Sequence, residues 1–195
     1  MEEDINTKAP ITWIENSRAS SIRESQAAAE LFPKNIFRET RAFHSRIPGY
    51  KISPLKSLPR LASMLGLGGI WVKDESSRLS LNSFKVLGGS YAMYRYVIEA
   101  LGDDSFDLFS DEGAQLVREK LGDITFAAAT DGNHGRGVAW SATRLGFKSI
   151  IYVHQNTSSA RIKAIESNGA KVVVVDGTYD DAVEQVNEDA QKNGW

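Results

Sequence analysis

Three short apolar runs alternate with longer segments of helical spacing in the second half of the sequence, and this alternation is the strongest constraint on the fold. The predicted strands span 124–129, 149–153 and 171–175. The predicted helices span 135–145, 158–167 and 179–191. Alternating strands and helices form parallel sheets, because each connection crosses back over a face of the sheet. The sequence therefore predicts the α/β class, with a parallel sheet that has helices on both faces.

The first part of the sequence is organised differently, since all five prolines lie between residues 10 and 59. The segment 53–59 contains two of them, which is too many for a central strand. A long helix over 83–101 has Asn82 or Ser83 in a position to cap its amino end. The other elements predicted here are helices over 22–31, 36–45, 60–65 and 114–121, a turn at 48–49 and a strand over 70–73.

The composition is that of an ordinary globular protein and excludes several classes. The chain has 195 residues, 42% of them apolar, and a formal net charge of −2. Disordered, collagen-like and coiled-coil sequences have different compositions. A slightly acidic chain without a basic cluster is a poor partner for nucleic acid. Its longest apolar runs are too short to span a membrane and its amino terminus has no secretory signal, so we expect no membrane partner and a cytoplasmic location.

Cysteine and histidine usage limits the possible chemistry further. The chain has no cysteine, which excludes disulfides, iron–sulfur clusters and thiol catalysis. Its three histidines, His44, His134 and His154, are never at helical ligand spacing, so no structural metal site is expected. We expect structural roles for His44 and His154, and His134 is expected to cap the helix that follows it.

The loop after the first predicted strand is a candidate binding site. It runs from Thr130 to Gly137 with three glycines in its last six positions, and a helix begins within it. Such a loop is either a simple strand-to-helix turn or a site where free amide groups meet an anion. It is not a dinucleotide fingerprint, because Trp140 occupies the place of the third glycine. Arg136 is expected to face solvent.

A second candidate site precedes the long helix. Lys85 lies in its opening turn, where the helix dipole disfavours an ammonium ion and favours the neutral amine that attacks aldehydes. A solvated surface lysine is the alternative. Gly88 and Gly89 follow one turn later, although each costs about 1 kcal/mol in a helix relative to alanine. A flat group packed against the helix would explain both glycines. The residues Asp74, Glu75 and Ser76 are expected to shape the loop that presents Lys85.

The order of these motifs resembles a known enzyme family. The sequences Ser-Pro-Leu at 53–55, Trp-Val-Lys-Asp-Glu-Ser at 71–76, Ser-Phe-Lys at 83–85 and Asp-Gly-Asn-His-Gly at 131–135 are similar to those of fold type II pyridoxal phosphate enzymes, the tryptophan-synthase-β type. Within that group, residues 81–91 and 130–140 resemble the diaminopropionate ammonia-lyases. The resemblance runs from about residue 10 to the last residue.

The resemblance implies a cofactor site. Pyridoxal 5'-phosphate is the implied cofactor, and Lys85 corresponds to the lysine that holds it. Asn133 corresponds to the asparagine that hydrogen-bonds the phenolic oxygen of the ring, and Phe84 corresponds to a residue packed nearby.

The resemblance also implies a substrate site. Thr130, Gly132 and His134 correspond to the segment that receives the carboxylate of a small amino acid. Asp131 departs from the dehydratases of the group, which usually have a small hydroxyl residue there. A carboxylate at this position can act as a second base beside Lys85, or bind an amino group.

The implied reaction is the β-elimination of ammonia from D- and L-2,3-diaminopropionate, which gives pyruvate and ammonia. A serine or threonine dehydratase is the alternative within the same chemistry, and a catalytically inactive truncated module is the alternative outside it. Family members continue into a glycine-rich phosphate-binding loop, which this sequence lacks. We therefore expect an amino-terminal fragment, with residues 1–100 from the large cofactor-binding domain, residues 101–195 from a smaller mobile domain, and a homodimeric full-length parent.

Overall fold

A computed structural model of the chain describes residues 30–195, apart from the side chain of Lys34. The chain divides into two units between residues 38 and 39, and residues 39–195 form the second of them. The second unit contains both candidate sites and is described below. The helix predicted over 22–31 lies almost entirely outside the described residues. The division into a large and a small domain near residue 100 stays a prediction.

The second half of the chain forms the predicted parallel sheet. Strands β3 (Thr125–Ala129), β4 (Lys148–His154) and β5 (Lys171–Val175) are ordered β3-β4-β5, and both pairs are parallel. Each strand is followed by a helix: α6 (Asn133–Arg144), α7 (Ser159–Glu166) and α8 (Tyr179–Asn193). The prediction of the α/β class is confirmed.

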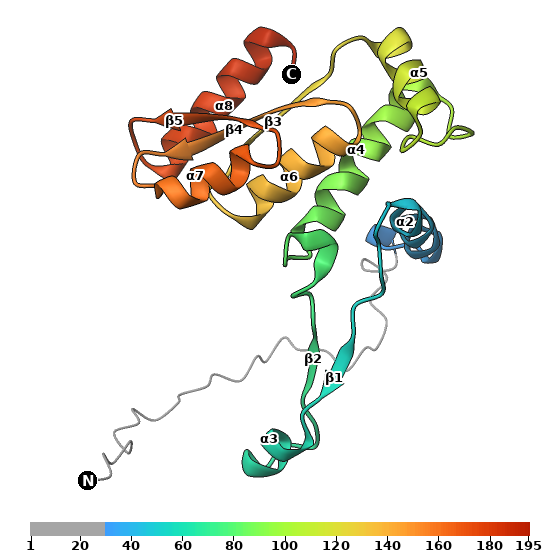
Figure 1. Cartoon of the computed structure of the whole chain (residues 1–195), viewed down its shortest axis with the longest axis vertical. Coiled ribbons are helices and arrows are strands. Elements are labelled where there is room, and N and C mark those ends of the chain that lie inside the picture. Colours follow the sequence, from blue (N-terminus) through green and yellow to red (C-terminus); the bar gives the residue numbers. More distant parts are fainter. Residues whose placement is uncertain (1–29) are drawn as a thin grey trace. The chain divides into compact units, whose positions relative to one another are not determined.

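The strand β4 shows how both faces of the sheet are covered. Its alternate residues Ile151 and Val153 are buried in a large core to which α6 and α7 contribute. The residue between them, Tyr152, is buried on the opposite face against Ala182 and Val186 of α8. Side chains alternate between the two faces of a strand, so β4 packs against helices on both sides. Figure 1 shows α8 on the opposite side of the sheet from α6 and α7.

The helices α4 (Lys85–Leu101) and α5 (Asp111–Leu121) complete the large core. The α4 helix was expected to have its cap at Asn82 or Ser83, but it begins at Lys85 and its N-cap residue is Phe84, which makes no side-chain capping bond. The Ser83 hydroxyl still accepts a bond from the Lys85 backbone amide, at 3.3 Å. The α5 helix begins three residues earlier than predicted, because Ser110 caps it by accepting from the Gly113 amide at 3.0 Å.

A two-stranded ribbon precedes α4. Strand β1 (Leu55–Ser57) pairs antiparallel with β2 (Trp71–Lys73), and helix α3 (Pro59–Met64) connects them. The segment 53–59 was not expected to form a central strand, and β1 is a short strand between its two prolines. Helix α2 (Lys34–Arg46) and the turn at Pro48-Gly49 confirm the predictions there, the turn being closed by a bond from the Tyr50 amide to the Ile47 carbonyl at 2.9 Å.

The part of the chain that the structure describes contains no helix long and apolar enough to cross a membrane.

Candidate functional site

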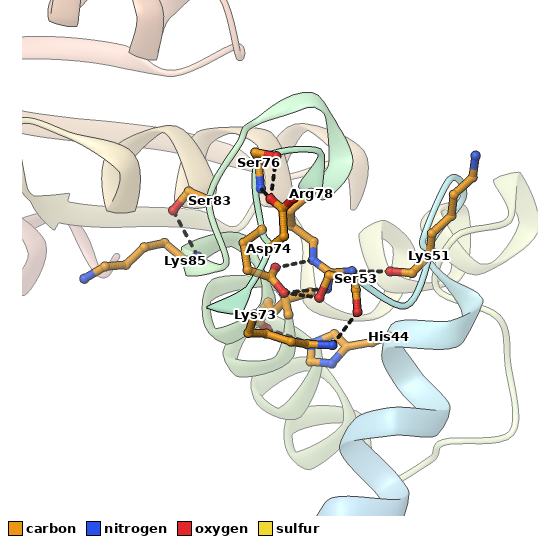
Figure 2. Close-up of polar contacts among 11 residues, drawn as sticks. His44, Lys51, Ser53, Lys73, Asp74, Ser76, Arg78, Ser83 and Lys85 are labelled. Atoms are coloured by element: carbon orange, nitrogen blue, oxygen red, sulfur yellow. Dashed lines mark hydrogen bonds and ion pairs between the residues drawn. The ribbon is translucent and has the colours of Figure 1, made fainter. Parts of the chain in front are cut away.

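Lys85 is presented by an irregular loop that enters α4 from the ribbon. The loop contains a short 3-10 turn, η1 (Arg78–Ser80), and three residues with positive φ angles, Leu79 at 48°, Ser80 at 60° and Asn82 at 57°. Such angles are unfavourable for residues other than glycine, so this loop is held by its surroundings. Lys85 itself is exposed at the start of the helix, and Figure 2 shows its side chain directed away from the polar cluster behind the loop.

That polar cluster is centred on the guanidinium group of Arg78, which is buried although it is charged. It donates to both carboxylate oxygens of Glu75, at 2.6 and 3.0 Å, and to the Lys51 carbonyl at 2.6 Å and the Ser53 hydroxyl at 3.0 Å. Ser53 also donates to Glu75. The hydrogen bond from Arg78 lowers the pKa of Glu75. Arg78 thus ties the beginning of η1 to residues 51 and 53 (Figure 2).

Asp74 stabilises the start of the same loop. Its Oδ1 accepts from the backbone amide and the hydroxyl of Ser76, at 3.0 and 2.5 Å, and its Oδ2 pairs with Lys56 at 2.5 Å. These contacts, first the one with Lys56, hold the pKa of Asp74 well below its usual range. The contacts of Asp74, Glu75 and Ser76 support the expectation that they shape the loop before Lys85.

The start of α6 packs directly on the start of α4. A Cβ atom at Gly137 would lie 3.0 Å from the backbone nitrogen of Val86 and 3.2 Å from the carbonyl carbon of Lys85, so a side chain there would force the backbones apart by a few tenths of an ångström. His134 is one turn earlier on α6, and its pKa is lowered by burial and then by the positive charge of Lys85. The prediction that His134 caps α6 is wrong, because the N-cap residue is Gly132 and His134 lies inside the helix.

Asp131 lies among basic side chains at the carboxyl edge of the sheet. Arg161 Nη1 donates to its Oδ2 at 2.5 Å, and His154 Nε2 lies 3.7 Å from the same oxygen. His154, for which a structural role was expected, thus also lies beside Asp131. Sequence reasoning missed Arg161 altogether, because an exposed arginine at the start of a helix carries no signal by itself.

A cavity of about 350 Å³ opens beside Asp131. Its lining residues are Asp131, Gly132, Asn133, Arg136, Ala160, Arg161 and Ala164. The prediction that Arg136 faces solvent is wrong, since it is half-buried, donates to Asn133 Oδ1 at 3.3 Å and has a buried Nε without a hydrogen-bond partner.

The start of α6 adjoins both the backbone of Lys85 and the cavity beside Asp131. His134 and Gly137 face Lys85 and α4, whereas Asn133 and Arg136 line the cavity that contains Asp131. Lys85 does not line this cavity, although Asp131 was expected to act as a second base beside it. A common cleft between Lys85 and Asp131 stays a prediction.

The remaining predicted site residues flank the same segment. Thr130 follows β3, and its amide donates to the Tyr152 carbonyl at 2.9 Å. Gly132 is the N-cap residue of α6, and Asn133 is its first residue, with an exposed side chain. Phe84 directly precedes Lys85 and is 59% exposed. Their roles in binding stay predictions.

The surroundings of Gly88 and Gly89 on α4 are consistent with the implied cofactor. A Cβ atom added at Gly88 would have no neighbour within 4 Å, and one at Gly89 would meet only ordinary contacts, at 3.9 Å. Packing within the described residues therefore does not require either glycine. Gly88 lies one turn after Lys85, so the surface of α4 next to the lysine is open, as packing of a flat group there would require. By contrast, the described residues contain no cluster of three or more His, Asp or Glu side chains that could hold a metal ion.

Comparison with known proteins decides the family. Residues 47–195 match the family model described as pyridoxal-phosphate dependent enzyme. The chain belongs to this family. Pyridoxal 5'-phosphate is therefore its cofactor, as the sequence predicted, and the fold is the type II fold of these enzymes.

The family members most similar to the chain include diaminopropionate ammonia-lyases. The Salmonella typhimurium enzyme is 44% identical over 170 residues, which is 87% of this chain and 42% of that protein. Two crystal structures of the Escherichia coli enzyme are 40% identical in sequence to this chain, and each match covers 88% of this chain. The apo form has a TM-score of 0.72 and is covered to 44%, and the complex with D-serine has a TM-score of 0.71 and is covered to 41%. The chain thus spans less than half the length of these relatives.

Substitution of Gly137 tests the packing of α4 on α6. We expect Gly137→Ala to lower the free energy of unfolding by about 1–3 kcal/mol, because the added methyl group meets backbone atoms that cannot move aside cheaply. The matched control Gly88→Ala, in open helix, should be neutral or stabilising by up to about 1 kcal/mol. Urea unfolding followed by circular dichroism measures both. Equal effects of the two substitutions would contradict the close approach.

Proposed function

We propose that the enzyme to which this chain belongs eliminates ammonia from both enantiomers of 2,3-diaminopropionate and yields pyruvate and ammonia. The observation that carries the proposal is the close packing of the glycine-rich start of α6, which directly follows the loop with Asp131, on the backbone of Lys85 and Val86. The 44% identity to the Salmonella typhimurium diaminopropionate ammonia-lyase and the D-serine complex of the Escherichia coli enzyme support it.

In this proposal Lys85 holds the cofactor, with Phe84 and Asn133 beside its ring. When bound, pyridoxal phosphate supplies an electron sink that acidifies the α-proton of the substrate. Thr130, Gly132 and His134 orient the substrate carboxylate, with backbone amides at the start of α6 as donors.

In this proposal the site accepts both enantiomers of the substrate because it has two bases. Lys85 removes the α-proton of one enantiomer and Asp131 removes that of the other, since a proton on the opposite face needs a base on that side. The Cα–H bond breaks, the proton passes to the base, and the β-amino group takes up a proton and leaves as ammonia. Addition of water to the unsaturated product then gives pyruvate and a second ammonia.

Pyruvate release tests the proposal directly. Because the chain spans 42% of the Salmonella enzyme, the assay uses a chimera in which the matched residues of this chain replace their counterparts in that enzyme. We expect pyruvate from both D- and L-diaminopropionate in a lactate dehydrogenase-coupled assay. The absence of pyruvate from both would refute the proposal. For the 195-residue chain alone we predict weak or no cofactor absorbance, the result expected if it is an inactive module by itself.

A serine or threonine dehydratase is the second candidate, because the Haemophilus influenzae threonine dehydratase is 33% identical over 132 residues, which is 68% of this chain and 21% of that protein. Substitution of Asp131 separates the two. In an ammonia-lyase, Asp131→Ser should reduce the turnover of at least one diaminopropionate enantiomer by about 10²-fold or more, since a base is lost. In a dehydratase, where a small hydroxyl residue is usual there, the turnover of serine or threonine should barely change.

The homodimeric state of the full-length enzyme and its cytoplasmic location stay predictions from the sequence. Size-exclusion chromatography with light scattering would test the dimer.

A further inference from the structure

The ion pair between Arg161 and Asp131 connects two elements at the carboxyl edge of the sheet. Asp131 lies in the loop after β3, and Arg161 lies in the first turn of α7. The side chain of Arg161 is 61% exposed and that of Asp131 is 31% exposed. Ion pairs this exposed add little to folding stability, because water screens the charges. The contact therefore matters mainly for where the carboxylate of Asp131 points.

His154 is a second basic group on the side of the Asp131 carboxylate that Arg161 contacts. The backbone amide of Asn156 donates to its Nδ1 at 3.2 Å, so the neutral ring carries its proton on Nε2. That nitrogen lies 3.7 Å from Asp131 Oδ2, the oxygen that Arg161 also contacts. Both basic groups thus lie next to Oδ2 of Asp131, and neither of these two contacts involves Oδ1.

We propose that Arg161 is a positioning residue for the proposed base Asp131. By holding Oδ2, it fixes the side-chain rotamer of Asp131, which lines the 350 Å³ cavity, and leaves Oδ1 to accept the α-proton of one substrate enantiomer. This inference rests on the proposed function and extends it to a residue outside the glycine-rich segment. Misplacement of a reacting group by about 1 Å can cost up to about 10²-fold in rate, so a small rotation of Asp131 has a large effect.

The test compares the two enantiomers in the chimera described above. The Asp131→Asn variant first identifies the enantiomer that depends on Asp131. Arg161→Ala should then reduce kcat for that enantiomer about tenfold or more, and for the other enantiomer less than about twofold. Arg161→Lys, which keeps a cation at this position, should recover part of the loss. Lys163→Ala, which removes an exposed cation two residues further along α7, is the control and should change neither rate.

A second measurement does not depend on activity. In the 195-residue chain, the carboxyl carbon resonance of Asp131, assigned by its loss in Asp131→Asn, should shift in Arg161→Ala and stay in place in Lys163→Ala. An unshifted resonance would overturn the proposal.

The outcomes separate this inference from the proposed function. Equal loss for both enantiomers in Arg161→Ala, or no loss for either, overturns the positioning role while pyruvate release by the parent chimera still supports the function. If Asp131→Asn leaves both rates unchanged, Arg161 has no base to position and the inference is overturned as well. If the parent chimera releases no pyruvate, the proposed function fails, and the positioning role in that reaction fails with it.

Discussion

Replacing Lys85 by alanine is expected to abolish covalent attachment of pyridoxal phosphate and to reduce turnover by about 10³-fold or more, because the residue proposed to hold the cofactor and act as one base is lost. Its position supports this expectation. Lys85 is exposed at the first residue of α4, with open space beside Gly88 and the start of α6 packed against its backbone.

The measurement is reduction of the cofactor-loaded chimera with borohydride, followed by mass spectrometry of the labelled peptide. The parent protein should carry the label on Lys85, and the Lys120→Ala control, which removes an exposed lysine on α5, should behave like the parent. Labelling of another of the eleven lysines at full level in Lys85→Ala would show that the assignment is wrong.

Replacing Arg78 by methionine should lower the free energy of unfolding by about 3 kcal/mol, because it leaves the largely buried carboxylate of Glu75 without its partner. The side chain of Arg78 is 4% exposed and that of Glu75 is 18% exposed. The control is Arg95→Met, which breaks the exposed pair with Glu99 and should cost less than about 1 kcal/mol. Urea unfolding of the 195-residue variants measures both values.

A companion variant and the pH dependence sharpen this test. Adding Glu75→Gln to Arg78→Met should recover part of the loss, since the uncompensated charge is removed. The pKa of Glu75 is lowered in the folded protein, so its contribution to stability is present above its ordinary pKa and is lost as the pH falls through the folded value. Arg78→Met should lack this acid-dependent component. A variant that unfolds at the same urea concentration as the parent at every pH would contradict the proposed role of the network.

The sequence predicted the elements of the fold more accurately than the contacts of the site. Strands and helices follow from the spacing of apolar residues, which is local information, so β3, β4 and β5 and the parallel class could be predicted. The beginnings of α4 and α5 could not, because single residues decide them. Ser110 forms a cap that extends α5 to Asp111, and the positive φ angle of Asn82 delays the regular turn of α4.

The contacts around Asp131 depend on which strands are neighbours and in what register. Ala129 of β3 lies opposite Tyr152 of β4, so the same register two residues further on places Asp131 level with His154. Nothing in either strand taken alone indicates this pairing. The rule that functional groups gather at the carboxyl ends of adjacent parallel strands is the signal that could have found His154 and Arg161, since His154 ends β4 and Arg161 lies in the helix that follows it.

The contact between Gly137 and the Lys85–Val86 backbone has a mechanical consequence. Because the backbones of the first turns of α4 and α6 touch at Gly137 without intervening side chains, neither turn can be pushed toward the other without moving it. A movement of the predicted small domain relative to the large one would therefore have to separate this backbone contact or leave both turns on the same side of the hinge.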